Sequence, residues 1–281
     1  MIEIKNITKV YGKKKNTFTA LKDVSLAIEE GSSVAVLGKS GSGKSTLMHA
    51  ISGLDKPQQG EVIINGEDIL RLKPKATDRF RARTMGFIFQ SFFVEGGESC
   101  YDNVSLSLET AGVPRSQRRR RIVAALEAVG LEDKIKARAK DLSGGQKQRL
   151  AIARAIAAEP QILFADEPTG NLDSATSAVV EDLLFRYAKE HGATLIIVTH
   201  DEDLAQRCQR IIRIKDGVID HDSAMDDKAT TASPKAKKTP TRRRAKAVAP
   251  AMRPKKTTKK ATSTTTKAKS TTTKPTPRRA D

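Results

Sequence analysis

Eight consecutive residues, 38–45, combine glycines with a lysine and a serine at a defined spacing. They read Gly-Lys-Ser-Gly-Ser-Gly-Lys-Ser and fit the phosphate-binding pattern G-x-x-x-x-G-K-[ST]. Glycines at this spacing let successive backbone N–H groups turn toward one anion, and a following helix adds its positive end. In such a loop Lys44 bridges the β- and γ-phosphates of a nucleotide, and Ser45 offers its hydroxyl to Mg²⁺. A glycine-rich turn without a ligand is the alternative, but the apolar run Ser33–Leu37 directly before the loop favours the phosphate site.

Two adjacent carboxylates, Asp166 and Glu167, follow the apolar run 161–165. An aspartate at the end of a buried strand can hold Mg²⁺ through water, and a second carboxylate can accept a proton from an attacking water. Alone, such a pair is more typical of a solvated loop. In a chain that also has the phosphate-binding loop, the pair predicts the metal- and base-bearing part of a nucleotide-hydrolysing site.

Residues 142–146, Leu-Ser-Gly-Gly-Gln, precede the helix-like run 147–157. Ser143 is a favourable N-cap for that helix, and Gly144 and Gly145 allow another molecule to approach the backbone closely. Because a helix N-terminus presents unpaired N–H groups and a positive dipole end, we expect a second anion site here. A capped helix without a ligand would need only the serine.

The rest of the sequence supplies elements that would position these motifs. Short apolar runs that predict buried strands alternate with amphipathic stretches that predict helices. The predicted strands span 33–37, 161–165 and 194–199, and the predicted helices lie near 44–52 and 174–190. This alternation predicts an α/β fold, a parallel sheet flanked by helices that binds ligands at the carboxyl ends of its strands.

Two further segments differ from this alternation. Residues 1–9 and 18–29 contain strand-like pieces, from which we expect a small antiparallel sheet beside the parallel one. Residues 101–140 are mostly helical in pattern, with breaks at 112–114 and 130.

Composition argues against several other classes of protein. In the 281 residues no apolar run approaches the roughly 18 needed to span a bilayer. The N-terminus lacks the organisation of a secretory signal. Cys100 and Cys208 have no cysteine or histidine neighbours at ligand spacing, so we expect free thiols rather than a disulfide or structural zinc.

The C-terminal segment carries almost all of the net charge of +18. Residues 228–281 hold 18 Lys/Arg, 14 Thr, 6 Pro and one Asp, whereas the preceding residues hold 33 Lys/Arg against 32 Asp/Glu. Because the segment has no Leu, Ile, Phe, Tyr or Trp, it buries too little apolar surface to offset its ordering entropy. We therefore expect a globular domain, 1–222, and a disordered basic tail, 223–281. The tail would contact anionic lipid or nucleic acid, or serve only solubility.

The phosphate loop, Leu-Ser-Gly-Gly-Gln and the Asp-Glu pair occur in the order and spacing of the ATP-binding cassette (ABC) ATPases. Residues 1–221 resemble that family, and Leu-Ser-Gly-Gly-Gln is specific to it. The resemblance implies a P-loop NTPase core with a RecA-like parallel sheet, a small antiparallel β subdomain and an α-helical subdomain. It implies ATP and Mg²⁺ as cofactors, with these residues around the phosphates: Gly38, Ser40, Gly41, Ser42, Gly43, Lys44, Ser45 and Thr46.

The resemblance also assigns roles to single residues. Tyr11 lies where the family stacks an aromatic ring on adenine, although a lone tyrosine is more often surface packing. Gln90 matches the glutamine that senses Mg²⁺ and the attacking water. His200 matches the histidine that contacts the γ-phosphate, where a structural histidine is the alternative. With Asp166 on the metal, Glu167 is the implied base.

In the family, two copies pair head to tail. Each ATP then lies between Lys44 of one copy and the Leu-Ser-Gly-Gly-Gln element of the other. The loop Asn171-Leu-Asp173 crosses to the partner copy. The implied contacts from the second copy are Ser143, Gly144, Gly145, Gln146 and Asp173.

Residues 166–174, Asp-Glu-Pro-Thr-Gly-Asn-Leu-Asp-Ser, most resemble the branch of lipoprotein-release, macrolide-export, bacitracin-export and cell-division ATPases. One segment departs from that branch. Residues 91–100 replace a Leu-Leu-Pro-like stretch that lines the groove for the permease's coupling helix in the family. Phe92 and Phe93 either anchor a partner in this groove or pack locally.

The resemblance implies the ATPase subunit of a membrane ABC complex, a homodimer that drives a polytopic permease on another chain, at the cytoplasmic face of the cell membrane. The alternative is a soluble ABC ATPase that acts on nucleic acid or ribosomes through its basic tail. The segment between Gln90 and Leu142 has room for only a compact helical subdomain, which favours the transporter. A non-catalytic tethering protein is disfavoured because the catalytic set is complete.

Overall fold

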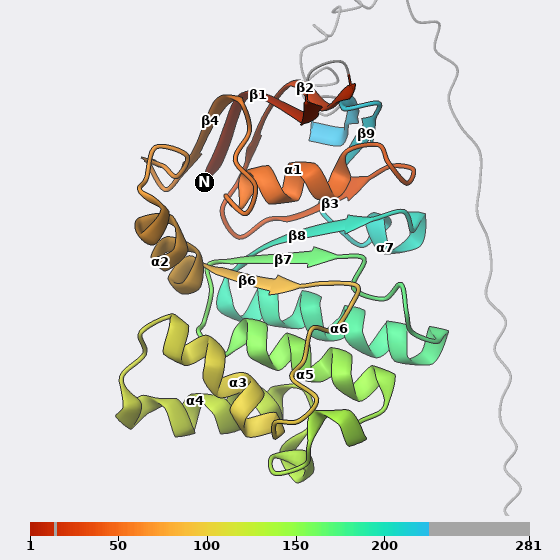
Figure 1. Cartoon of the computed structure of the whole chain (residues 1–281). Helices are drawn as coiled ribbons and strands as arrows, with labels where there is room; N and C mark the ends of the chain where they lie inside the picture. Colours follow the sequence, from red (N-terminus) through yellow and green to blue (C-terminus); the bar gives the residue numbers. More distant parts are fainter. Residues whose placement is uncertain (14–15, 225–281) are drawn as a thin grey trace, which may run out of the picture. The chain divides into compact units, whose positions relative to one another are not determined.

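The structure, a computed structural model, describes residues 1–13 and 16–224 (Figure 1). The predicted disorder and the predicted lipid or nucleic-acid contacts of the tail concern residues outside this part of the chain. Ser223 and Ala224, which the sequence assigns to the tail, still contact the domain. The backbone N–H of Ile211 donates to Ser223 Oγ at 3.0 Å, and that of Ala224 donates to Asp222 Oδ1 at 3.2 Å.

The strands of the described residues form a four-stranded and a six-stranded sheet. Their bounds are β1 Ile2–Lys13, β2 Asn16–Ile28, β3 Ser33–Leu37, β4 Gln59–Ile64, β5 Glu67–Asp68, β6 Met85–Ile88, β7 Ile162–Asp166, β8 Thr194–Thr199, β9 Arg210–Lys215 and β10 Val218–Asp222. The smaller sheet is antiparallel, in the order β2-β1-β4-β5. The larger has the order β10-β9-β3-β8-β7-β6, parallel except for β10.

Helices cover both faces of the larger sheet (Figure 1). Their bounds are α1 Lys44–Ile51, α2 Pro74–Thr84, α3 Cys100–Thr110, α4 Arg115–Ala128, α5 Gly144–Ile156, α6 Ser174–His191 and α7 Glu202–Gln206, with short 3-10 turns at Glu132–Lys134 and Ala139–Asp141. α1 lies between the two sheets, α5 and α6 cover the opposite face, and α3 and α4 pack outside α5. None of the helices in residues 1–13 and 16–224 is both long and apolar enough to cross a membrane.

Each central strand divides its side chains between two cores. In β3, Val34 and Val36 pack in the core that contains α1 and the antiparallel sheet. Ala35 and Leu37 pack in the core that contains α5 and α6. This explains why the strand is a continuous apolar run: a parallel strand covered on both faces has no solvent side.

The predicted α/β architecture is confirmed, including the antiparallel sheet, the parallel sheet and the helical segment broken near 112–114 and 130. The sequence reasoning missed the β9–β10 hairpin. Its turn, Asp216-Gly217, has φ of 51° and 79°, and two left-handed residues in a two-residue loop are typical of a type I′ turn. The Asp-Gly dipeptide was the available signal. The N–H of Gly217 donates to Ser42 O at 3.0 Å, so this hairpin supports the phosphate-binding loop.

Candidate functional site

A cavity of about 910 Å³ opens at the carboxyl ends of β3, β7 and β8. It is lined by Tyr11, Phe18, Ala20, Leu37, Gly38, Lys39, Ser40, Gly41, Gly43, Lys44, Ser45, Thr46, Gln90, Asp166, Glu167, His200, Glu202 and Arg213. Most of the residues singled out from the sequence therefore face one pocket. Ser42 does not, because its side chain is buried behind the loop.

The loop before α1 leaves the helix end free for a ligand. Gly43 is the N-cap at φ 107°, and no side chain caps α1. A Cβ at Gly43 would lie 2.7 Å from Ala20 O, so a larger residue would not fit. Lys44 Nζ donates to Gly38 O at 2.9 Å and to Lys39 O at 3.2 Å, which holds the ammonium group over the loop. Uncapped N–H groups and a cation together suit an anionic ligand.

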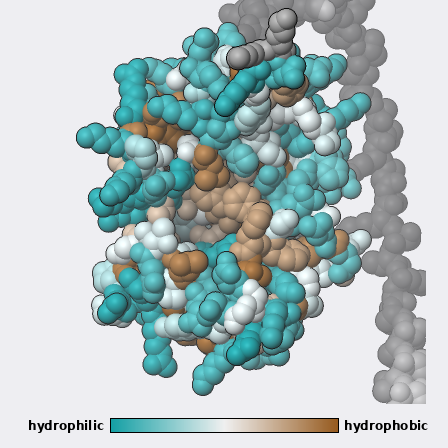
Figure 2. Space-filling model, in the orientation of Figure 1, coloured by the Kyte–Doolittle hydropathy of each residue, from teal (hydrophilic) through white to brown (hydrophobic). Residues whose placement is uncertain are grey.

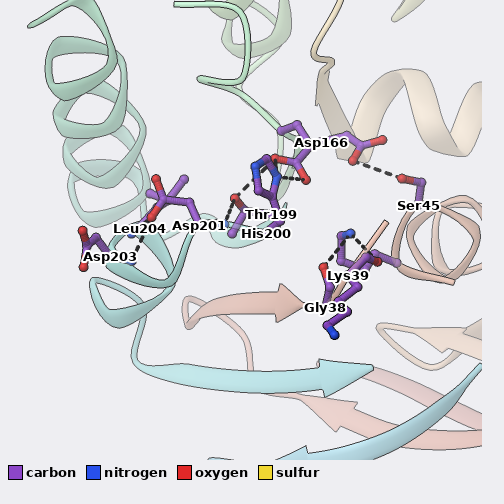
Figure 3. Close-up of polar contacts among 11 residues, drawn as sticks. Gly38, Lys39, Ser45, Asp166, Thr199, His200, Asp201, Asp203 and Leu204 are labelled. Atoms are coloured by element: carbon purple, nitrogen blue, oxygen red, sulfur yellow. Dashed lines mark hydrogen bonds and ion pairs between the residues drawn. The ribbon is translucent and has the colours of Figure 1, made fainter. Parts of the chain in front are cut away.

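Ser45 and Asp166 meet at the base of the pocket (Figure 3). Ser45 Oγ donates to Asp166 Oδ1 at 3.2 Å. Burial raises the pKa of Asp166, and the Glu167 carboxylate raises it further, against the opposing hydrogen bond from Ser45. A divalent cation beside the ligand's phosphates would relieve this unfavourable charge. Mg²⁺ is commonly bound by one or two protein oxygens plus phosphates and water, so a hydroxyl and a carboxylate at this spacing fit it.

Glu167 and His200, which follow β7 and β8, are in contact with each other. His200 Nδ1 lies 2.9 Å from both carboxylate oxygens of Glu167. Glu167 adopts a left-handed φ of 47°, and its N–H donates to Val198 O at 2.8 Å. A left-handed backbone is costly for glutamate, and such strain is concentrated at functional positions.

Gln90 reaches the pocket from the segment after β6. Its backbone carbonyl accepts from Asn171 Nδ2 at 2.8 Å. The loop after β7 and the loop after β6 are thereby joined at the edge of the pocket.

The Leu-Ser-Gly-Gly-Gln element does not line this cavity. As predicted, Ser143 is the N-cap of α5, and it forms a capping box with Gln146. A Cβ at Gly145 would lie 2.4 Å from Thr176 Cγ2, so packing inside the chain already requires this glycine. Asp173 caps α6: hydrogen bonds from the backbone and side chain of Thr176 lower its pKa.

A second cavity, about 320 Å³ in volume, forms a groove along β6. Its lining comprises Ala82, Met85, Gly86, Phe87, Phe89, Leu106, Ser107, Thr110, Arg154, Ala155 and Ala158. Figure 2 shows apolar side chains gathered in the middle of this face, over β6 and the segment that follows it.

Arg154 in α5 holds the segment beside this groove. Its guanidinium donates to Phe93 O at 2.5 Å and Phe92 O at 3.2 Å. Phe93 has a left-handed φ of 48°, is 65% exposed and contacts Phe89 edge-on, with 5.5 Å between ring centroids. Phe92 is half-buried beside the start of α5, near Gly144. The two phenylalanines therefore differ: one packs locally and the other is presented to solvent.

Comparison with known proteins identifies the family. A family model described as "ABC transporter" matches residues 21–170. The chain belongs to the ABC transporter family. LolD, the ATP-binding protein of the lipoprotein-releasing system of Syntrophus aciditrophicus, is 42% identical over 219 residues, which are 78% of this chain and 98% of LolD. The macrolide export ATP-binding/permease protein MacB of Syntrophobacter fumaroxidans is 43% identical over 225 residues, 79% of this chain and 32% of MacB.

Solved structures agree with this assignment. The chain is similar to the ATP-binding cassette MJ0796 in a dimeric post-hydrolysis state bound to ADP and Pi, with a TM-score of 0.73 and 39% identity over 79% of this chain and 97% of that one. The predicted family, and the branch with lipoprotein-release and macrolide-export proteins, are confirmed. The chain contains an ABC transporter ATP-binding domain and is an ATPase.

Sequence reasoning missed several residues that line the pocket of this ABC ATPase. Phe18 lies directly opposite Tyr11 in the β1–β2 pairing, which could have been expected of two aromatic residues flanking a short turn. Arg213 and Glu202 form a two-point ion pair, with both N–O distances at 2.7 Å. Their elements are brought together by the sheet order, and no local pattern signals this. Lys39 occupies an unspecified position of the loop motif.

Proposed function

We propose that this ABC ATPase is the ATP-binding and hydrolysing subunit of a membrane transporter complex. Two copies would pair head to tail around two ATP molecules and drive a separately encoded permease at the cytoplasmic face of the cell membrane. The names of the relatives support this: one is the ATP-binding protein of a lipoprotein-releasing system, another joins ATP-binding and permease parts, and MJ0796 is dimeric.

The observation that carries the proposal is that the Leu-Ser-Gly-Gly-Gln element of a chain lies outside that chain's own nucleotide pocket. Its pocket contains the phosphate loop, both carboxylates and His200, whereas the residues from Ser143 to Gln146 lie outside it. Two copies related by a twofold axis would each supply what the other lacks. In this arrangement Gly144 and Gly145 contact the partner's ATP from the N-terminus of α5, and Asp173 lies at the crossing loop.

The residues of the pocket then divide the work on ATP. Lys44 and the loop amides bind the β- and γ-phosphates, and Tyr11 stacks on the adenine base. Ser45 and Asp166, with Gln90 nearby, would hold Mg²⁺, which supplies charge neutralisation to the phosphates. The hydroxyl–carboxylate contact of 3.2 Å between Ser45 and Asp166 supports this assignment.

Glu167 is the proposed general base for the attacking water, and His200 contacts the γ-phosphate. In the structure His200 Nδ1 lies 2.9 Å from both carboxylate oxygens of Glu167. Movement of the imidazole toward the γ-phosphate would free an oxygen of Glu167 to accept the proton of water.

The groove along β6 is the proposed docking site for the permease. Its apolar lining and the exposed ring of Phe93 fit an amphipathic helix that buries an apolar face. Because Gln90 faces the nucleotide and is close in sequence to Phe93, the groove and the pocket share one segment.

Complementation between two inactive variants tests the head-to-tail pairing. Glu167→Gln removes the base, and Ser143→Asp keeps an N-cap while placing a negative charge where the partner's γ-phosphate would approach. In a mixed dimer, one site carries both substitutions and the other carries none. Co-expression should therefore restore about a quarter of wild-type turnover, because half of the dimers are mixed and each has one intact site.

Ser143→Asn is the matched control, since asparagine also caps a helix but adds no charge. It should retain most of the turnover on its own. Absence of any recovery in the mixture, with ATP binding retained by both variants, would contradict the shared site. Full turnover by a demonstrably monomeric chain would do the same.

A further inference from the structure

An ion pair with a buried lysine and a partly exposed aspartate lies behind the aromatic ring of Tyr11. Lys9 Nζ donates to Asp55 Oδ1 at 2.5 Å and to Lys56 O at 2.8 Å. The other carboxylate oxygen, Asp55 Oδ2, accepts from the hydroxyl of Tyr11 at 2.7 Å. Lys9 Nζ also lies 4.9 Å from the centroid of the Tyr11 ring. The ring is thus held at two places, by its hydroxyl and by a cation at its face.

The exposure of the three side chains increases from the buried lysine to the tyrosine that faces the pocket, as expected if the ion pair holds the ring from behind. The side chain of Lys9 is 6% exposed, that of Asp55 is 36% exposed, and Tyr11 is 40% exposed and lines the nucleotide pocket. Burial alone would raise the pKa of Asp55, but the hydrogen bonds from Lys9 and Tyr11 outweigh it and lower the pKa. The carboxylate therefore stays charged, and its hydrogen bond to the phenol is charge-assisted.

The same network is tied to the helix that follows the phosphate loop. The N–H of Asp55 donates to His49 O at 3.1 Å, which fixes the aspartate to the last turn of α1. Thr46, in the first turn of α1, lines the same pocket as Tyr11. The ring is positioned relative to α1, and hence relative to the phosphates, rather than only to its own strand.

We propose that Asp55 and Lys9 are positioning residues that hold the Tyr11 ring at the angle and depth needed to stack on the base of the nucleotide. This inference rests on the proposed role of Tyr11 in base binding. An aromatic ring on an exposed hairpin has rotamer freedom that stacking would have to remove. The ion pair removes that freedom before the nucleotide arrives, so base recognition depends on two residues that never touch the base.

Binding measurements on the full chain separate this role from a structural one. ATP and inorganic tripolyphosphate are titrated calorimetrically in EDTA, which prevents hydrolysis. Because one charge-assisted hydrogen bond is lost, Asp55→Ala should weaken ATP binding about five- to tenfold, and tripolyphosphate binding less than about twofold. Tyr11→Phe, which deletes only the hydroxyl and leaves the ion pair in place, should weaken ATP binding about three- to fivefold, again with no loss for tripolyphosphate.

The double variant Tyr11→Phe/Asp55→Ala tests whether Asp55 acts through Tyr11. Its loss of ATP affinity should equal that of Asp55→Ala rather than the product of the two single losses. Asp55→Asn, which retains an acceptor oxygen, should recover part of the affinity. Asp68→Ala is the matched control, because Asp68 also pairs with a basic side chain, that of Arg71, but lies outside the pocket, so ATP binding should not change.

Equal losses for ATP and tripolyphosphate in Asp55→Ala, or multiplied losses in the double variant, would overturn the proposal. Tyr11→Ala separates this from a failure of the proposed function. If Tyr11→Ala leaves ATP affinity unchanged, Tyr11 does not bind the base at all. If Tyr11→Ala weakens ATP binding while Asp55→Ala and Tyr11→Phe do not, the ring binds the base but needs no support.

Discussion

Two helix N-termini in this chain are both suited to phosphate, yet they are built differently. α1 begins at Gly43, and no side chain among the described residues caps its first N–H groups. α5 begins at Ser143 with a capping box, in which Ser143 and Gln146 satisfy one another's backbone groups. α1 also has a lysine folded over its loop, whereas α5 begins with two glycines and a glutamine.

The difference shows which end depends on a ligand. α1 leaves its polar groups to the nucleotide and is held in shape by surrounding backbone, such as Gly217 N–H bonded to Ser42 O. α5 has a side-chain cap of its own, which pairs the N–H groups of Ser143 and Gln146.

Lys44→Ala provides the largest expected effect and tests the dependence of α1 on charge. Removing the cation at the uncapped helix end should weaken ATP binding at least about a hundredfold, because several charge-assisted contacts to phosphate are lost together. Calorimetry in EDTA measures this. Ser143→Asp under the same conditions should leave binding to a single copy within about twofold; equal losses at both helices would remove the distinction.

Arg154→Gln tests whether α5, near its C-terminal end, also holds residues 91–95 beside the β6 groove. Without the two guanidinium hydrogen bonds to the carbonyls of Phe92 and Phe93, amide hydrogen exchange across 91–95 should accelerate about tenfold. Exchange in α1 should not change. If the segment exchanges as slowly as in the wild type, its left-handed Phe93 is held by other contacts.

Ser143→Ala measures the capping box directly. Loss of the cap should lower the free energy of unfolding by about 1 kcal/mol, read from denaturant titration. Ser143→Asn should cost almost nothing, because it keeps a capping oxygen. α1 has no equivalent cap to remove, so a cost near zero for Ser143→Ala would make the two helix ends alike.

The smallest expected effect is on how stability changes with pH at the β9–β10 hairpin, which supports the phosphate-binding loop. Burial would raise the pKa of Asp222, but Arg210, donating at 2.8 and 2.5 Å, outweighs it and holds the pKa below its ordinary value. A lowered pKa in the folded state stabilises the fold above the unfolded pKa of about 4, and this contribution is lost as pH falls through the lower folded value.

Denaturant midpoints measured from pH 7 to pH 3 test this sign. The stability difference between the wild type and Asp222→Asn should be constant above about pH 5 and should shrink below about pH 4. A difference that instead grows toward low pH would contradict the lowered pKa.

Local patterns predicted the elements that carry motifs, because each signal lies within one segment. The run Ser33–Leu37 is apolar throughout since both of its faces are buried, and Ser143 marks the start of α5 because capping is a local hydrogen bond. Periodicity likewise located α6, which spans Ser174–His191.

What could not be predicted depends on residues far apart in sequence. The Glu202–Arg213 pair, the contact of Gly217 with Ser42 and the hydrogen bond from Tyr11 to Asp55 each join residues of different elements, and single-segment patterns do not encode such contacts. Glu167 was named as a candidate base from its place after a strand, but its left-handed backbone and its contact with His200 were visible only in three dimensions.

The turn at Asp216-Gly217 shows that a sequence fragment with the phosphate-binding motif need not contain everything that shapes the loop. The family match ends at residue 170, yet the backbone that steadies Ser42 arrives more than forty residues later. A fragment that ends before β9 would keep every glycine and lysine of the phosphate-binding loop. It would still lack the hydrogen bond from Gly217 N–H to Ser42 O. A fragment can therefore contain the complete phosphate-loop motif without the contacts that hold the loop in its binding conformation.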